Sequence, residues 1–299
     1  MSNFPGLPSK LPFRGVRRGM LPRGLILAAF CVGIVYVALF AFRGRLHPVT
    51  GWPILGRAFF KALPAVLLAA GTQVAGQGTA HAARVAVALA IFSVGDAFLD
   101  VEAQFPRVGG IGIDYFLLGL GSFLVALLAL ARAYTIGAPR FEPVVAIATA
   151  TPCVIVAGRL WPYISVHSDA AVLQPAMAIY FAALAAMFYG AATRNTQHTR
   201  EAWATTAGSA LFLASNAALA FDRFAPPATD PVTGVPRWWA AQPTLVVLAL
   251  YWAAIALIAD GAAASAGASV RDPSVDVALL LRKKNREKAR INIKEEKED

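Results

Sequence analysis

The chain has 299 residues, of which 58% are hydrophobic and 15% are charged, and its mean hydropathy is +0.58. A soluble domain is usually about half apolar and about a quarter charged, so this composition, with its apolar residues in long blocks, excludes a soluble protein and indicates a polytopic membrane protein. The net charge of +10 gathers at the two ends of the chain without interleaved aromatic residues or a nucleic-acid-binding motif, which argues against nucleic acid as a partner and favours cytoplasmic flanks that attract anionic lipid headgroups.

Eight apolar stretches are long enough to cross a bilayer, and they predict an all-α membrane protein with eight transmembrane helices in one bundle. The first stretch exceeds a signal-peptide core and lacks a small-residue cleavage site, so we predict that it is retained. Pro152 and Pro175 are predicted to kink their helices. The predicted spans are residues 24–42, 54–74, 82–101, 111–134, 141–161, 170–192, 203–222 and 238–260.

Both ends of the chain differ in composition from the predicted bundle of residues 24–260. Residues 1–23 are rich in Pro, Gly and Arg and are predicted to be disordered. Residues 261–299 are predicted to begin as a flexible small-residue linker and to end as a basic tail. That tail either forms a helix on the membrane surface or stays solvated.

The basic ends also predict the orientation of the chain in the membrane. An even number of spans places both termini on one side, and the excess of Lys and Arg at both ends predicts that this side is cytoplasmic. The membrane would be the endoplasmic reticulum in a eukaryote, or the inner or plasma membrane in a bacterium. The oligomeric state stays open.

An acidic residue, Asp96, stands inside the third predicted span. A carboxylate in the hydrocarbon costs about 2.5–3.5 kcal/mol on insertion scales, so such an acid is a functional-site candidate unless it lies near a helix end and reaches water. Ser93, Asp96 and Asp100 are spaced i, i+3 and i+7 and therefore share one helix face.

Two further polar residues lie at the depth of Asp96, about a third of the way into their spans from the predicted outer side. Lys61, Asp96 and Asn216 are therefore predicted to line one polar cavity. Lys61 either binds a phosphate or keeps Asp96 ionised, or it reaches the interface together with Arg57. Asn216 is either part of the site or a hydrogen-bonding contact between helices.

Other polar and large residues of the spans have simpler predicted roles. Tyr115, Gly119 and Ser122 form a small, partly polar face on the fourth span. Four acids near span ends are predicted to lie at the membrane interface, namely Asp100, Asp114, Asp222 and Asp260. Three residues of the sixth span are predicted to serve packing: Met177, Tyr180 and Met187.

The sequence argues against several kinds of site. The histidines His47, His81, His167 and His198 all fall in predicted loops, which argues against a zinc site inside the membrane. Two cysteines in separate spans form neither a disulfide framework nor a CxxC metal site. The last two spans lack the lysine of a retinal protein, and no histidine in a span could activate Ser122. We therefore expect no metal and no cofactor.

Five short motifs occur in order between residues 24 and 260. Phe92-Ser-Val-Gly-Asp96-Ala-Phe-Leu resembles S-x-x-G-D-x-x-L, matching its G-D-x-x-L part with the serine one position later, and Lys61-Ala-Leu-Pro64 resembles K-x-L-P. The segments starting at Phe116, Gly208 and Tyr251 resemble F-x-x-G-x-x-x-F, G-x-x-x-F-x-x-S-[DN]-x-x-L-A and Y-x-x-A-x-x-L-I. In this combination the chain resembles the YhhN-like membrane family, which includes the lysoplasmalogenases.

The resemblance implies an eight-helix bundle that cleaves the vinyl ether bond of lysoplasmalogens into a fatty aldehyde and a glycerophospho-base. Such a bond is opened by protonation of its β-carbon, and removal from water favours the protonated form of a carboxyl group. The resemblance then makes Asp96 the general acid, Asn216 the group that orients water, and Lys61 a substrate-binding residue. The remaining predicted substrate-binding residues are Ser93, Ser215, Tyr115 and Ser122.

The chain departs from the family pattern at three places. Many members have aspartate where this chain has Asn216, histidine near Ala126 and Leu127, and glutamine or histidine where Ile255 stands. This thinner polar set leaves open a catalytically weak or inactive relative that binds a lysolipid as a sensor, carrier or scaffold. A transporter or receptor with Asp96 as its proton or ligand site is a further alternative.

Overall fold

The computed structural model describes residues 21–38, 54–76, 79–104, 114–135, 141–166, 170–194, 199–225 and 243–269. These residues form eight α-helices and no strand, which confirms the predicted all-α class. The helices are α1 (Arg23–Tyr36), α2 (Ile54–Ala75), α3 (Ala80–Gln104), α4 (Tyr115–Tyr134), α5 (Pro143–Ser165), α6 (Ala170–Thr193), α7 (Thr199–Phe224) and α9 (Pro243–Ser269).

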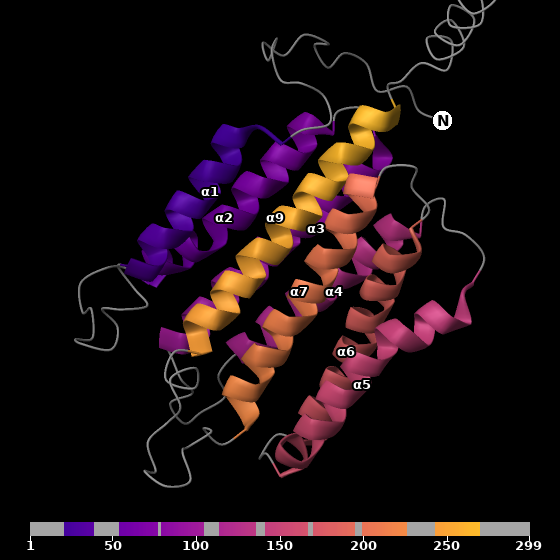
Figure 1. Ribbon diagram of the computed structural model, residues 1–299. Coiled ribbons are helices and arrows are strands. Elements are labelled where there is room, and N and C mark those ends of the chain that lie inside the picture. The colour runs from indigo at the N-terminus through magenta and orange to yellow at the C-terminus, as the bar shows by residue number, and fades with distance from the viewer. Residues whose placement is uncertain are drawn as a thin grey trace, which may run out of the picture.

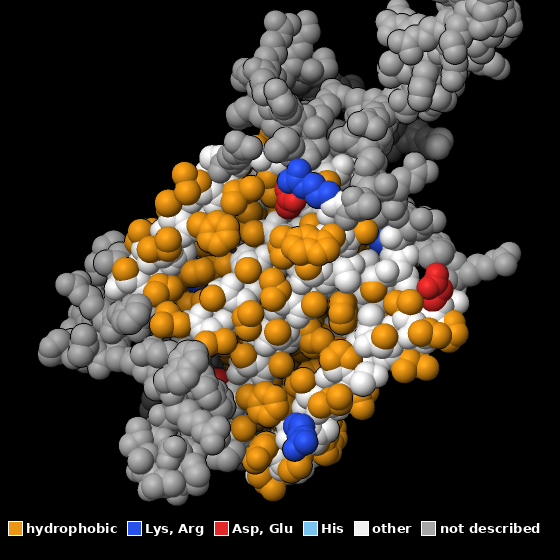
Figure 2. Space-filling view, in the orientation of Figure 1, with side chains coloured by type: hydrophobic (Ala, Val, Ile, Leu, Met, Phe, Trp, Pro, Cys, Tyr) orange, Lys and Arg blue, Asp and Glu red, His pale blue; other side chains and the backbone are white. Residues whose placement is uncertain are grey.

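Seven of the described helices, α2 to α7 and α9, are long and apolar enough to cross a membrane, and the described part of α1 is shorter. Large apolar side chains stand on the outside of these helices, such as Val144 (78% exposed), Phe141 (72%) and Trp203 (67%). Figure 2 shows one face of the molecule covered by hydrophobic side chains with few charged groups among them. Because lipid is the solvent for such a surface, the protein is an integral membrane protein.

All eight described helices contribute buried residues to the hydrophobic core. α9 packs along α7 and also contacts α2 and α3, while α6 joins α4 to α5 and α7. α1 and α5 lie at opposite edges of the bundle (Figure 1). This arrangement brings α2 and α3 together with α7 and α9, which are distant from them in sequence, around one interior region.

α7 and α9 pack closely against each other at two glycine positions. A Cβ atom added to Gly208 would lie 2.9 Å from the backbone oxygen of Ala254 and 3.0 Å from the backbone nitrogen of Ile258. A Cβ atom on Gly261 would lie 3.2 Å from the backbone nitrogen of Thr205. Small residues at such positions let two membrane helices pack backbone to backbone, which fixes the position of α9 along α7.

The end of α9 corrects one prediction. Residues 261–269 were predicted to start a flexible linker, but α9 continues to Ser269, and Gly261, Ala262 and Ala263 are buried. A run of small residues suits close packing against α7 as well as it suits a linker, and here packing prevails.

The start of α4 and the N-terminal segment also refine the predictions. Asp114, predicted to be interfacial, caps α4 by accepting a hydrogen bond from the Leu117 backbone N–H at 3.2 Å. Of residues 1–23, predicted to be disordered, only 21–23 are described; Leu21 is buried at 3% exposure and Arg23 begins α1. The predicted tail beyond residue 269 lies outside the described residues.

Candidate functional site

A polar cavity of about 90 Å³ lies among α2, α3, α7 and α9, with Phe123 of α4 in its wall. A water molecule needs roughly 10–15 Å³ of such space, so the cavity can hold several waters. Its polar lining is Lys61, Asp96, Ser215, Asn216, Asp222 and Tyr251. The structure therefore brings Lys61, Asp96 and Asn216 around one cavity, together with Ser215.

Asp96, on α3, lines this cavity and is only 3% exposed. The hydroxyl group of Tyr251, on α9, donates a hydrogen bond to Asp96 Oδ2 at 2.7 Å. The Tyr251 ring is held edge-on against the rings of Phe123 and Phe212, with centroids 6.1 and 5.9 Å away. Asp96 thus does not lie near a helix end in water; it is fixed in the interior by a rigid donor.

Asn216 is held by two hydrogen bonds. The hydroxyl group of Tyr180, on α6, donates to Asn216 Oδ1 at 2.6 Å. The amide nitrogen of Asn216 donates to the backbone carbonyl of Phe212, one turn earlier on α7, at 2.8 Å. Tyr180 was predicted to serve packing, and its hydroxyl group in addition bonds a residue of the cavity.

The remaining residues of the polar lining come from α2 and α7. Lys61 is half-buried. The Ser215 hydroxyl group donates to the Val247 carbonyl at 2.9 Å and so ties α7 to α9. Asp222, predicted to be interfacial, is exposed near the end of α7 and also lines the cavity. The lining thus combines one cationic and two acidic side chains.

Three predicted substrate-binding residues lie away from this lining. Ser93 is buried and donates to the Ala90 carbonyl at 2.6 Å, and Ser122 donates to the Leu118 carbonyl at 3.0 Å. Tyr115 stands at the first position of α4. None of the three lines the polar cavity, and none lines the smaller apolar cavity described below. Both serine hydroxyl groups bond to their own helix, a common arrangement within helices.

A second, apolar cavity of about 30 Å³ adjoins the polar one among α3, α4, α6 and α7. The two cavities share Leu99, Phe123, Asn216 and Leu219. Aromatic and aliphatic side chains dominate its wall, and the guanidinium group of Arg223 lies 4.9 Å from the centre of the Phe116 ring. A polar and an apolar compartment thus meet at Asn216.

Asp100, one turn beyond Asp96 on α3, corrects another prediction. It was predicted to be interfacial but is 1% exposed. It accepts a hydrogen bond from the Tyr36 hydroxyl group at 2.6 Å and pairs with Arg57 at 3.5 Å. Asp100 therefore links α1, α2 and α3, and Arg57 is occupied in the interior.

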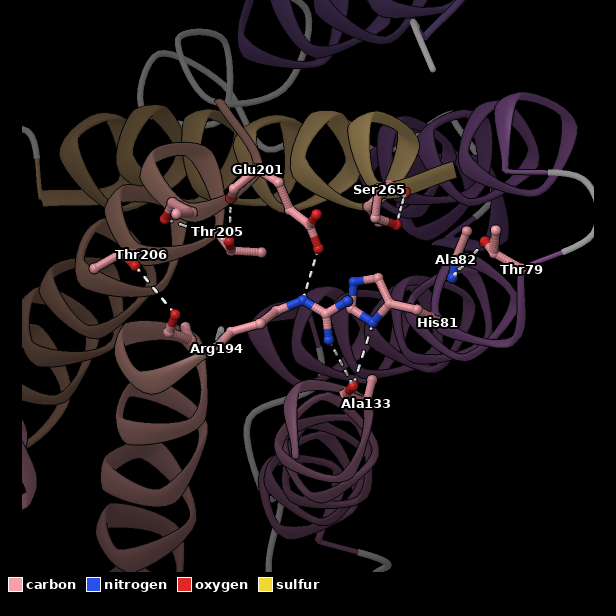
Figure 3. A network of polar contacts seen from close by, with 12 residues as sticks. Thr79, His81, Ala82, Ala133, Arg194, Glu201, Thr205, Thr206 and Ser265 are labelled. Carbon is pink, nitrogen blue, oxygen red and sulfur yellow. Dashed lines mark hydrogen bonds and ion pairs between the residues drawn. The ribbon is translucent and has the colours of Figure 1, made fainter. Parts of the chain in front are cut away.

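A further polar cluster lies at the opposite end of the bundle, where α3 begins and α4 and α6 end (Figure 3). Arg194 pairs with Glu201 at 2.6 Å and also donates to the Ala133 carbonyl at 3.3 Å. His81 lies on α3, not in a loop as predicted, and is 6% exposed with Nδ1 3.2 Å from the same carbonyl. The other three histidines lie outside the described residues. The described residues hold no cluster of His, Cys, Asp and Glu that could bind a metal.

Sequence reasoning missed Tyr180 and Tyr251 as partners of the cavity residues. Both bonds join helices whose adjacency the sequence does not reveal, since Tyr180 lies on α6 and Tyr251 on α9. One clue was present for Tyr251, which lies about two turns from the start of α9, at the depth of Asp96 and Asn216. The depth of Tyr251 in its span therefore points to the same cavity.

The sequence of this chain was compared with family profiles, with curated proteins and with solved structures. The profile of the YhhN family matches residues 56–262, a range that contains every residue of both cavities. A comparison with curated proteins and with solved structures finds no match.

Proposed function

The chain belongs to the YhhN family, and from that premise we propose that it is a membrane hydrolase that cleaves the vinyl ether bond of lysoplasmalogens. The products are a fatty aldehyde and a glycerophospho-base. The observation that carries the proposal is the buried carboxyl group of Asp96, held by Tyr251 in a cavity large enough for water. This is what acid-catalysed hydrolysis inside a membrane requires.

Asp96 supplies the proton that starts the reaction. Its carboxyl group protonates the β-carbon of the vinyl ether, and the carbon bound to oxygen becomes an oxocarbenium ion. Water adds to that carbon and returns one proton to the Asp96 carboxylate. The resulting hemiacetal collapses to the aldehyde and the free glycerol hydroxyl group, so that one water is consumed and the acid is regenerated.

The other residues of the cavity serve binding and orientation. Asn216, between the two cavities, holds the attacking water. Lys61 is the cation of the polar lining and binds the phosphate group or balances the charge that Asp96 acquires. The apolar cavity receives the hydrocarbon next to the scissile bond. An amphiphilic substrate fits a polar and an apolar compartment that share a wall.

The test compares a lysoplasmalogen with its saturated ether analogue on the purified full-length protein. The saturated ether has no double bond to protonate, so aldehyde is expected from the vinyl ether and none from the analogue. Binding of the analogue is measured in parallel. Binding of both lipids without aldehyde would contradict the hydrolase and leave a lipid-binding relative, whereas substrate-dependent flux in proteoliposomes would indicate a transporter.

A further inference from the structure

The side-chain amide of Asn216 has two chemically different ends, and its surroundings determine which end faces which neighbour. A backbone carbonyl can only accept a hydrogen bond, so the atom 2.8 Å from the Phe212 carbonyl must be the amide nitrogen. The amide oxygen then faces the Tyr180 hydroxyl group, 2.6 Å away, and accepts its proton. Both contacts agree on one orientation.

This orientation decides what Asn216 offers to the polar cavity. An amide carries two N–H donors, and one of them is used by Phe212. The second N–H remains for the cavity that Asn216 lines, whereas the amide oxygen is directed to Tyr180. Asn216 thus presents a hydrogen-bond donor, which binds the oxygen of a water molecule and leaves both of its protons free.

Tyr180 is buried, and its surroundings allow only one orientation of the Asn216 amide. Its side chain, on α6, is 4% exposed and lines the apolar cavity. Asn216 lines both this cavity and the polar cavity. A buried hydroxyl group needs a hydrogen-bond partner, and Asn216 Oδ1 provides it. Turning the amide around would place its N–H groups against the Tyr180 hydroxyl group and its oxygen against the Phe212 carbonyl, two acceptors face to face.

We propose that Tyr180 is a positioning residue that fixes the Asn216 amide with one N–H toward the polar cavity, where this N–H holds the oxygen of the attacking water. The inference rests on the proposed function. One lone pair of the water accepts the Asn216 N–H bond, the other adds to the oxocarbenium carbon, and the released proton goes to the Asp96 carboxylate. Asn216 takes no proton, and Asp96 alone acts as acid and then as base.

A double-mutant cycle in aldehyde production tests this role. Tyr180→Phe keeps the ring and removes only the hydroxyl group, so kcat should fall about tenfold, equivalent to roughly 1.4 kcal/mol, while KM and binding of the saturated ether analogue stay unchanged. In the Asn216→Asp background the loss should largely vanish, because a carboxyl group can exchange the roles of its two oxygens by moving a proton. An equal loss of kcat in both backgrounds would make Tyr180 merely structural and overturn the proposal.

The matched control is Tyr163→Phe. Tyr163 lies on α5, is 38% exposed and lines neither cavity.

A spectroscopic measurement tests the orientation without turnover. The chain has five asparagines, and in protein labelled with ¹⁵N at asparagine the Asn216 side-chain signals are those missing from Asn216→Asp. We expect two distinct N–H protons, one protected from solvent exchange by Phe212 and one exchanging with cavity water. Tyr180→Phe should remove this difference and Tyr163→Phe should preserve it.

The two experiments separate the two proposals. An Asn216 spectrum that Tyr180→Phe leaves unchanged would overturn the positioning role, whatever the kinetics. Absence of aldehyde from the folded wild-type protein would overturn the proposed hydrolase, while the spectrum would still decide the role of Tyr180. If Asn216→Asp has no turnover, the spectrum decides alone.

Discussion

Two tyrosine hydroxyl groups hold the two polar groups on which the proposed reaction depends. Tyr251 donates to Asp96 and Tyr180 donates to Asn216, each from a helix other than that of its acceptor. A buried polar group left without a hydrogen bond is energetically costly, so each pair holds its acceptor in one position. Such support keeps catalytic groups oriented before the substrate arrives.

Replacement of Tyr251 by phenylalanine tests this support at Asp96. The ring and its contacts with Phe123 and Phe212 stay, but the donor to Asp96 Oδ2 is lost. We expect kcat for the vinyl ether to fall about tenfold, the equivalent of one orienting hydrogen bond, with little change in KM. Steady-state aldehyde production measures this. Wild-type kinetics in Tyr251→Phe would show that this bond does not support catalysis.

The sequence predicted the polar residues of the site better than it predicted the residues that form hydrogen bonds or ion pairs with them. The depth of Lys61, Asp96 and Asn216 in their spans predicts a shared cavity, and the structure places all three around one. Asp100 was assigned to the interface because of its position near a span end, but Tyr36 and Arg57 bury it. Depth can be counted along one helix, whereas partners depend on how helices are arranged around each other.

At the scale of the helices, close contact between α7 and α9 sets the shape of the polar cavity, because both contribute to its wall. Gly208→Ala should push the two backbones apart, since a Cβ atom there lies 2.9 Å from the Ala254 oxygen. We expect a loss of about 1–3 kcal/mol in stability, measured as a lower unfolding temperature in detergent. Gly158→Ala on α5, where a Cβ atom meets nothing within 4 Å, is the control and should not destabilise. Equal effects at both glycines would contradict this account.

The buried ion pair that joins the end of α6 to the start of α7 provides another prediction at this scale. Arg194 and Glu201 are 12% and 3% exposed. Glu201→Gln leaves the Arg194 charge without its partner and should cost about 3–5 kcal/mol. Asp260→Asn breaks the more exposed pair with Arg200, 19% and 53% exposed, and should cost at most about 1 kcal/mol. Chemical unfolding in detergent measures the free energy of unfolding of both variants. A smaller decrease for Glu201→Gln than for Asp260→Asn would refute the claim that the buried pair contributes more to stability.

Apolar runs predicted where the helices lie, but they did not predict the C-terminal end of α9. The span predicted at 170–192 is α6, Ala170–Thr193, and the one predicted at 54–74 is α2, Ile54–Ala75. α9 runs well past its predicted end because Gly261 and its small neighbours pack on α7. Hydropathy measures transfer into lipid, and it does not detect a helix extended by contact with another helix.

At the scale of the whole molecule, the polar cavity lies in one half of the bundle. Lys61, Asp96, Asn216 and Tyr251 lie about two turns from the helix ends at which α2 and α9 begin and α3 and α7 end. The cluster around Arg194 and Glu201 lies at the other end. With cytoplasmic termini, the cavity would occupy the outer half of the membrane.

Cysteine labelling tests this orientation. Single cysteines, Ser2→Cys or Asp222→Cys, are placed in a chain whose Cys31 and Cys153 are replaced by serine. A membrane-impermeant thiol reagent added to intact cells should label Asp222→Cys, whereas Ser2→Cys should react only after permeabilisation. The reverse pattern would place the cavity in the cytoplasmic half.

The arrangement of the helices is the part of the whole molecule that the sequence did not predict. Eight apolar stretches predict one bundle, but nothing in their order indicates that α9 lies beside α2 and α3 as well as α7. That arrangement brings Tyr251 to Asp96. Membrane helices associate through packing and hydrogen bonds and not through a hydrophobic pattern, so composition carries little information about their neighbours.

The most direct test of the central claim is aldehyde production from a lysoplasmalogen by Asp96→Asn, beside the wild-type protein. Asparagine keeps the shape of aspartate and can still accept the Tyr251 bond, but it cannot supply a proton. We predict that Asp96→Asn folds and binds the saturated ether analogue but releases no aldehyde, while the matched control Asp260→Asn retains turnover. Wild-type turnover in Asp96→Asn would show that Asp96 is not the acid and would contradict the mechanism.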